Sequence, residues 1–321
     1  MRFQSLSFSL RKLPRRARVA CALPVVWIAF GSAFVALKVG VATVPPFLFS
    51  GGRFLLVGAL LLGWSAWRAR GRLNVSRQDV LIAAATGGGL IFAGQGAASW
   101  ASQYLTPGIV AVLSSTMPLW AALIGWVALG TRVARLGTVG LVAGFGGVAF
   151  LVWPTSRAGV QLVPAVVTTA GAVGWAAGAL FASRSSFARR PTLMTALQML
   201  VGGGLQVMLG LGSGEAGQVG LQQVVPAFPV FLYLVIVPAL IGFPLFTWLL
   251  THVPIHVANT VSYAAPVVAL ALGWLLLGQQ VTLRTLAGVA VILVGVGLIV
   301  WSAKGTAARK EEVRQLDKRA A

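Results

Sequence analysis

The feature that most constrains this chain is a series of ten apolar segments, each about 20 residues long and joined by short connecting stretches. A helix needs about 20 mostly apolar residues to cross the hydrocarbon core of a bilayer. A helix also satisfies its own backbone N–H and C=O groups, as lipid demands. The sequence therefore predicts an all-α polytopic membrane protein whose ten transmembrane helices occupy 19–37, 46–67, 80–101, 107–129, 134–153, 163–183, 192–211, 230–250, 255–277 and 281–301.

The composition agrees with a chain that lies mostly in lipid. Hydrophobic residues make up 58% of it and charged residues only 9%, whereas soluble domains carry about 25% charged residues. The run from Val19 to Leu37 is about spanning length and lacks a small-residue cleavage pattern at its end, so we expect the first membrane helix there rather than a cleaved signal. The lone Cys21 excludes an intrachain disulfide and a cysteine metal site.

The basic residues indicate which ends of the segments face the cytoplasm. The net charge is +20, but Lys and Arg stand at the ends of apolar segments rather than in a patch interleaved with aromatics, which argues against nucleic-acid binding. With the N-terminus placed inside, 21 of the 25 fall on the cytoplasmic side; Lys38, Arg157 and Arg284 fall on the opposite side, and Arg53 lies within a segment. Because Lys and Arg gather in cytoplasmic loops, we expect a multi-pass inner-membrane protein with both termini in the cytoplasm.

The two halves of the sequence repeat each other at a fixed distance of 148 residues. This spacing joins two tryptophan pairs, two glycine pairs and one proline pair, namely Trp126 and Trp274, Trp153 and Trp301, Gly130 and Gly278, Gly140 and Gly288, and Pro118 and Pro266. Each half holds five segments, and because five is odd, the second half enters the membrane from the other side. The sequence thus predicts two inverted five-helix repeats, an arrangement of secondary transporters.

These segments divide the chain into five parts. We expect a basic cytoplasmic N-terminus at 1–18, the first repeat at 19–153, a connecting loop at 154–162, the second repeat at 163–303 and a charged cytoplasmic tail at 304–321. The tail carries no pattern that indicates catalysis, so we expect function to lie within the two repeats.

Four stretches of the chain carry a family resemblance. They are WIAFGSAFVALK from Trp27, PPFLFSGGRFLLVGALLL around Arg53, WASQYLTPGIVAVLSSTMPLW from Trp100, and SYAAPVVALALGWLLLGQQVTLRTLAGVAVILVGVGLIVW from Ser262. With them the chain resembles the EamA branch of the drug/metabolite transporter superfamily, from about residue 20 to residue 303. The resemblance implies ten helices around a central cavity lined by helices 1, 3, 4, 6, 8 and 9. It also implies export of amino acids or other small metabolites without ATP.

The chain departs from this resemblance at two positions that bear on energy coupling. Family members often carry a glutamate where Ser102 stands in WASQ, and an acidic residue where Gln279 follows LG. All five acidic residues of the chain lie at segment ends, in loops or in the tail. Because membrane proton relays usually rely on Asp or Glu within a span, the sequence favours facilitation or exchange over proton-coupled efflux.

Polar and aromatic residues recur on the helices that the resemblance places around the cavity. In the third and ninth helices the spacings keep the polar residues on one face, and tryptophans offer π faces to a solute. The alternatives are interhelical hydrogen bonds for the polar groups and packing for the tryptophans. The residues expected to line a substrate cavity are Trp27, Gln95, Ser99, Gln103, Ser115, Trp120, Trp175, Asn259, Ser262 and Tyr263.

Four further residues stand out by their place in the segments. Pro118 and Pro266 occupy equivalent positions in the two halves, where a proline frees a carbonyl and bends a helix, so we predict hinges there. Arg53 lies about seven residues into its segment. It either clamps an anion or is a structural cation that bonds helix-end carbonyls and snorkels outward, and we predict the structural role. We predict that Lys38 anchors the first helix at the membrane interface.

The leading functional prediction is a secondary transporter, without cofactor or metal, that exports amino acids or related small metabolites through the central cavity. Drug efflux is an alternative in the same class. A membrane-embedded enzyme would need a nucleophile and a base, or a metal cluster, within the spans, and a non-transporting scaffold is a further class. The expected partners are a small-molecule solute and the lipid bilayer, with no nucleic acid, and we expect a monomer or homodimer.

Overall fold

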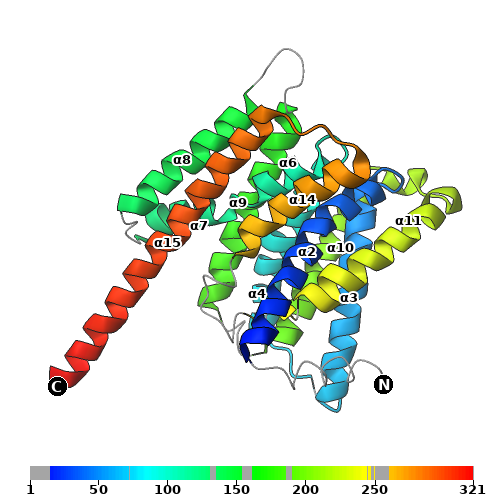
Figure 1. The fold of residues 1–321 in the computed structure, drawn as a ribbon. Coiled ribbons are helices and arrows are strands. Elements are labelled where there is room, and N and C mark those ends of the chain that lie inside the picture. The colour runs from blue at the N-terminus through cyan, green and yellow to red at the C-terminus, as the bar shows by residue number, and fades with distance from the viewer. Residues whose placement is uncertain are drawn as a thin grey trace.

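The protein is a bundle of packed helices (Figure 1). The computed structural model describes residues 15–71, 73–130, 135–153, 161–185, 190–243, 245–246, 249 and 260–320. Every regular element within these ranges is helical, which confirms the all-α prediction. In the same ranges nine continuous helical segments are long and apolar enough to cross a membrane, and α14 is a shorter apolar helix.

The helices follow the order that the apolar segments predicted. The first half contains α2 (Arg15–Val41), α3 (Pro46–Arg68), α4 (Arg77–Thr86), η1 (Gly87–Gln95), α5 (Gly96–Ala101), α6 (Pro107–Ser114), α7 (Met117–Leu129) and α8 (Arg135–Val152). The second half contains α9 (Leu162–Arg184), α10 (Pro191–Gly212), η3 (Glu215–Gln218), α11 (Leu221–Leu234), η4 (Val235–Gly242), α14 (Val261–Leu277) and α15 (Leu283–Ala320). Figure 1 shows α15 running on beyond the bundle toward the C-terminus.

The eighth span begins earlier than its apolar window predicted. The window covers 230–250, whereas α11 begins at Leu221 and continues without a break into η4, which ends at Gly242. The stretch LQQVVPAFP at its start mixes glutamine and proline with apolar residues, which lowers its mean hydropathy and argues against a helix interior. A membrane helix keeps such prolines because neighbouring helices and local π-helical adjustments satisfy the freed backbone groups.

The 148-residue repeat extends to the backbone. The helices α7 and α14 end at Leu129 and Leu277, and the residues that cap them, Gly130 and Gly278, are 148 residues apart and have φ angles of 62° and 61°. These left-handed C-caps favour glycine because a Cβ would clash with the following carbonyl. The two halves therefore share local conformation as well as sequence.

The last helices of the two halves, α8 and α15, lie side by side (Figure 1). A Cβ atom built on Gly295 would lie 2.5 Å from the backbone nitrogen of Gly144, and one built on Gly147 would lie 3.0 Å from the nitrogen of Ile292. The second contact is the first one with the two halves exchanged, because Gly147 corresponds to Gly295 and Gly144 to Ile292. The numbers of the contacting residues increase along one helix as they decrease along the other, so the equivalent helices are antiparallel and the repeats are inverted.

The helices α3 and α10 repeat this relation at a second interface. A Cβ atom on Gly58 would lie 3.0 Å from the nitrogen of Leu200, and one on Gly203 would lie 3.0 Å from the nitrogen of Leu55. Here the equivalent positions are 145 residues apart, counted from Pro46 and Pro191 at the two helix starts. Glycine lets both pairs of backbones approach closely. One pseudo-two-fold relation thus organises both pairs of equivalent helices.

Candidate translocation site

Two π-helical segments occupy equivalent positions in the two halves. Within the described residues, η1 begins at Gly87 in the third span and η4 begins at Val235 in the eighth, again 148 residues apart. The first packs against α9 and α10, and the second against α2 and α3. π-Helical segments are rare in proteins, and those that do occur are often found at functional sites. Neither segment was predicted from the sequence. The only sequence signal that relates the two is their equivalent position in the 148-residue repeat.

The fourth span has an irregular turn at Ser115 and Thr116, beside the predicted hinge residue Pro118. Its helix α6 ends at Ser114, and α7 begins at Met117, so Pro118 lies in the first turn of α7, where it needs no N–H group. The hydroxyl of Ser115 donates to the Val112 carbonyl (2.7 Å), and that of Thr116 donates to the Leu113 carbonyl (2.6 Å). Because the Thr116 N–H bonds to the Leu113 carbonyl, the Val112 carbonyl lacks its usual i+4 donor, and the Ser115 hydroxyl satisfies it. Ser115 is thereby buried in its own helix end.

Pro266 has a different setting from its counterpart. It lies inside α14, which begins at Val261 and is continuous around the proline. The two prolines are therefore equivalent in sequence but not in local structure, because one starts a helix and the other interrupts the hydrogen bonding of one. Their role as hinges stays a prediction.

The polar residues predicted in the third span do not all face one space in this conformation. Ser99 is fully buried, and its hydroxyl donates to the Pro46 carbonyl at the start of α3 (3.2 Å). Gln95 is partly buried and accepts from Arg53. Gln103 is exposed at the end of the span, where its backbone carbonyl accepts from Lys38 (3.0 Å). Two of the three thus hold α3 and one holds α2.

The ninth span contributes two described candidates. The Tyr263 hydroxyl donates to the Val296 carbonyl of α15 (3.2 Å), which ties α14 to the last helix. Ser262 beside it is partly buried. Asn259 lies outside the described residues. The hydrogen bonds of Ser99 and Tyr263 are the interhelical bonds that the sequence left as an alternative, and cavity lining by these residues stays a prediction.

Two of the candidate tryptophans, Trp27 and Trp175, contact the other half of the chain, whereas Trp120 packs within its own half. The Trp27 indole N–H donates to the Thr260 hydroxyl (3.1 Å), which joins α2 to the start of α14. Trp175 of α9 packs so closely over Gly94 that a Cβ there would lie 2.7 Å from its ring. Trp120 meets the Phe145 ring edge-on at 4.7 Å between centres, and its buried indole N–H has no partner among the residues that the structure describes. An unpaired buried donor is unusual and marks Trp120 as able to bind a polar group.

Arg53 is buried within the bundle and is only 5% exposed. Its Nη2 donates to Oε1 of Gln95 (3.3 Å), and its guanidinium carbon lies 4.4 Å from the centre of the Phe54 ring. The side chain therefore crosses to η1 rather than reaching outward to helix-end carbonyls. A charge in a membrane interior costs at least about 2.5–3.5 kcal/mol. Contact with an aromatic face offsets up to about 2 kcal/mol of that.

The two acidic side chains that the structure describes lie at the starts of short helical elements. Asp79 forms a capping box with Ser76 at the start of α4 and pairs with Arg190 at 3.2 Å. Glu215 is buried and accepts from the backbone N–H groups of Phe47 (3.3 Å) and Leu48 (2.8 Å) at the start of α3. Sequence reasoning placed Glu215 in a loop and missed this cap, which joins segments far apart in the chain.

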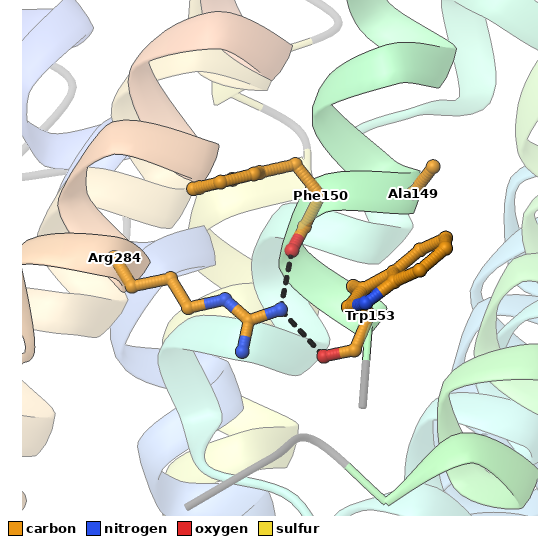
Figure 2. Close-up of a pocket in the computed structure, with 4 residues that line it drawn as sticks. All are labelled: Ala149, Phe150, Trp153 and Arg284. Carbon is orange, nitrogen blue, oxygen red and sulfur yellow. Dashed lines mark hydrogen bonds between the residues drawn. The ribbon is translucent and has the colours of Figure 1, made fainter. Parts of the chain in front are cut away.

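A surface pocket of about 500 Å³ lies at the end of α8, lined by Ala149, Phe150, Trp153 and Arg284 (Figure 2). Arg284 donates to the carbonyls of Phe150 (2.8 Å) and Trp153 (2.5 Å). Figure 2 shows the guanidinium turned toward these two carbonyls at the helix end. The arrangement closes a helix C-terminus, where a cation is favourable. It brings together none of the predicted cavity residues.

Inverted five-helix repeats with irregular helices at equivalent positions are the architecture of a secondary transporter in the membrane. The chain is thus a multi-pass membrane transporter rather than an enzyme. It belongs to the EamA-like transporter family, whose sequence profile matches residues 18–153 and 164–301.

Known proteins of similar sequence carry transporter names. The chain is 30% identical over 303 residues to the "Uncharacterized inner membrane transporter YedA" of Escherichia coli (strain K12), covering 88% of this chain and 92% of that protein. It is 27% identical over 294 residues to the "Probable amino-acid metabolite efflux pump" of Salmonella typhimurium, covering 88% and 94%. A solved crystal structure that is 22% identical matches with a TM-score of 0.60 over 89% of this chain and 98% of that one, which shows the fold alone.

Proposed function

We propose that the protein exports amino acids or related small metabolites from the cytoplasm by facilitation or exchange, without ATP. The observation that carries this proposal is the pair of π-helical segments at equivalent positions of two inverted repeats. Corresponding irregular segments in the two halves mark the solute path in such transporters. The solute class is supported by the relative named as an amino-acid metabolite efflux pump.

The proposed path lies between the halves, where the predicted residues would line a central cavity. Trp27, Trp120 and Trp175 supply aromatic faces, and Gln95 supplies an amide that is partly exposed. In this conformation Ser99 and Tyr263 are engaged by carbonyls of neighbouring helices. Their exposure to solute therefore requires those helices to separate, as alternating access between two repeats provides.

Transport is expected to proceed without a proton gradient. The five acidic residues of the sequence leave no carboxylate in the middle of a span, and the buried Glu215 is held by two backbone N–H groups. In proteoliposomes preloaded with an unlabelled amino acid, counterflow of the labelled form should be unchanged when an ionophore collapses the pH gradient. Protein-free liposomes are the control. Uphill accumulation that appears only with an imposed proton gradient would contradict the proposal.

Both termini are expected in the cytoplasm. The distribution of Lys and Arg along the sequence motivates this orientation. Reporter fusions after residue 321 and within 69–76 should therefore give a cytoplasmic signal, whereas a fusion within 213–220 should give a periplasmic one. A periplasmic C-terminus would reverse the proposed direction of insertion.

A further inference from the structure

Arg53 is a fixed positive charge whose hydrogen-bonding capacity is largely unused. A guanidinium carries five N–H donors, and the structure gives this one a single hydrogen bond, to Oε1 of Gln95 at 3.3 Å. Its Nε is buried and has no partner in the described part of the chain. The remaining contact is the face of the Phe54 ring, 4.4 Å away. Most of the donors are therefore available to another group.

No carboxylate of the described chain neutralises this charge. Of the two acidic side chains that the structure describes, Asp79 pairs with Arg190, and Glu215 accepts from the first turn of α3. Neither of them forms an ion pair with Arg53. A buried charge without a partner is unfavourable unless something else supplies one. The site therefore favours an anionic group from outside the chain.

Other unpaired polar atoms lie on the helices that meet here. Ser50, three residues before Arg53 on α3, is fully buried, and its hydroxyl has no partner. On α10, Gln206 is fully buried, and its Oε1 has no partner, although its amide N–H donates to the Ile91 carbonyl of η1 (2.6 Å). Buried polar atoms are nearly always paired. Their gathering on α3 and α10, on either side of η1, indicates a site for a polar ligand.

We propose that Arg53 binds a carboxylate of the transported solute, with the Ser50 hydroxyl and the Gln95 amide as further donors. This rests on the proposed function as a transporter. The planar fork of a guanidinium matches the two oxygens of a carboxylate, and Gln95 keeps its N–H groups free while its oxygen accepts from Arg53. In this conformation α3 and η1 enclose the guanidinium, so binding requires η1 to move from α3. The π-helical form of η1 fits that need.

The test measures thermal unfolding of the purified full-length protein with a panel of neutral L-amino acids, each beside its own α-carboxamide. The acids are expected to raise Tm and the amides to leave it unchanged. In Arg53→Gln the shift should be lost, with affinity at least tenfold lower, because a charge-assisted pair is removed. Arg53→Lys keeps the charge without the fork and should bind with intermediate affinity. Arg68→Gln makes the same change at an exposed position of α3 and should keep the full shift.

If Arg53→Gln does not fold, Ser50→Ala replaces it in the test. Ser50→Ala should reduce the Tm shift that the acids produce, and the amides should still produce none. Equal shifts from acids and amides, no shift from any acid, or a shift that survives Arg53→Gln would overturn the assignment. Flux through proteoliposomes separates this outcome from failure of the proposed function. If acids and amides are both transported and their flux survives Arg53→Gln, the protein is a transporter, but the proposed carboxylate site is excluded. An acid-specific shift lost in Arg53→Gln, without flux of any amino acid, supports the site and counts against amino-acid export.

Discussion

Replacing Gly295 with alanine is expected to force α8 and α15 apart and to lower the free energy of unfolding by about 1–3 kcal/mol, the usual effect of overpacking a closely packed interior. The added Cβ would lie 2.5 Å from the nitrogen and 2.6 Å from the Cα of Gly144. Backbone atoms cannot rotate away as a side chain can, so the helices themselves must separate. Survival of the folded protein after heating in detergent, followed by size-exclusion chromatography, measures the effect.

The same helix offers a matched control. A Cβ on Gly297 meets nothing within 4 Å, so Gly297→Ala should be neutral or stabilise the helix by up to about 1 kcal/mol, the propensity of alanine over glycine. Gly147 of the first repeat corresponds to Gly295. A Cβ added at Gly147 would lie 3.0 Å from the Ile292 nitrogen. Gly147→Ala should therefore destabilise as well. Equal stability of Gly295→Ala and Gly297→Ala would contradict the close approach of the two repeats.

Glu215→Ala is expected to destabilise the protein by about 2–4 kcal/mol, because it removes two charge-assisted hydrogen bonds at a helix N-terminus. The carboxylate accepts from Phe47 and Leu48 and is the contact that joins η3 to the start of α3. Glu215→Gln keeps one oxygen and should lose about half as much. The measurement is again thermal unfolding in detergent.

The control for this cap is Gln218→Ala, an exposed position on the same short helix, which should leave stability unchanged. If Glu215→Ala is as stable as Gln218→Ala, water must replace the carboxylate at the two backbone N–H groups. The capping role of Glu215 would then be excluded.

The arrangement of spans could be predicted from the sequence because each span depends on its own composition. The window 46–67 predicted α3 within a residue at its end. The same criterion was wrong at α11, which begins at Leu221 rather than near 230. Averaged hydropathy penalises the glutamines and prolines of its first turns. The glutamines lie among the first residues of the helix, whose N–H groups need no intrahelical partner, and Pro226 and Pro229 lie inside the helix, where neighbouring helices and π-helical adjustment compensate.

The π-helical segments show what composition does not encode. The segment η1 reads GGGLIFAGQ and η4 reads VIVPALIG, so one is rich in glycine and the other in branched residues and proline. Both nevertheless begin at equivalent positions of the repeat. Because local sequence differs and position in the fold agrees, packing against neighbouring helices must select the conformation.

The partners of the polar residues depended on tertiary structure in the same way. Spacing alone placed Gln95 and Ser99 on one face of the third span. In the structure both side chains turn toward α3, where Ser99 meets the Pro46 carbonyl and Gln95 meets Arg53. Both partners lie on α3, more than 40 residues away along the chain, and no periodicity within the third span indicates them.

The sequence by itself determined that this chain spans the membrane repeatedly and that its halves are inverted copies. Both follow from quantities counted along the chain: apolar length, an odd number of spans in each half and a 148-residue spacing. Only the tertiary structure decided that Arg53 is a buried cation that pairs with neither described carboxylate, and that Glu215 caps α3. Those properties arise where distant helices approach, and burial and pairing of a charge depend on what lies around it in space.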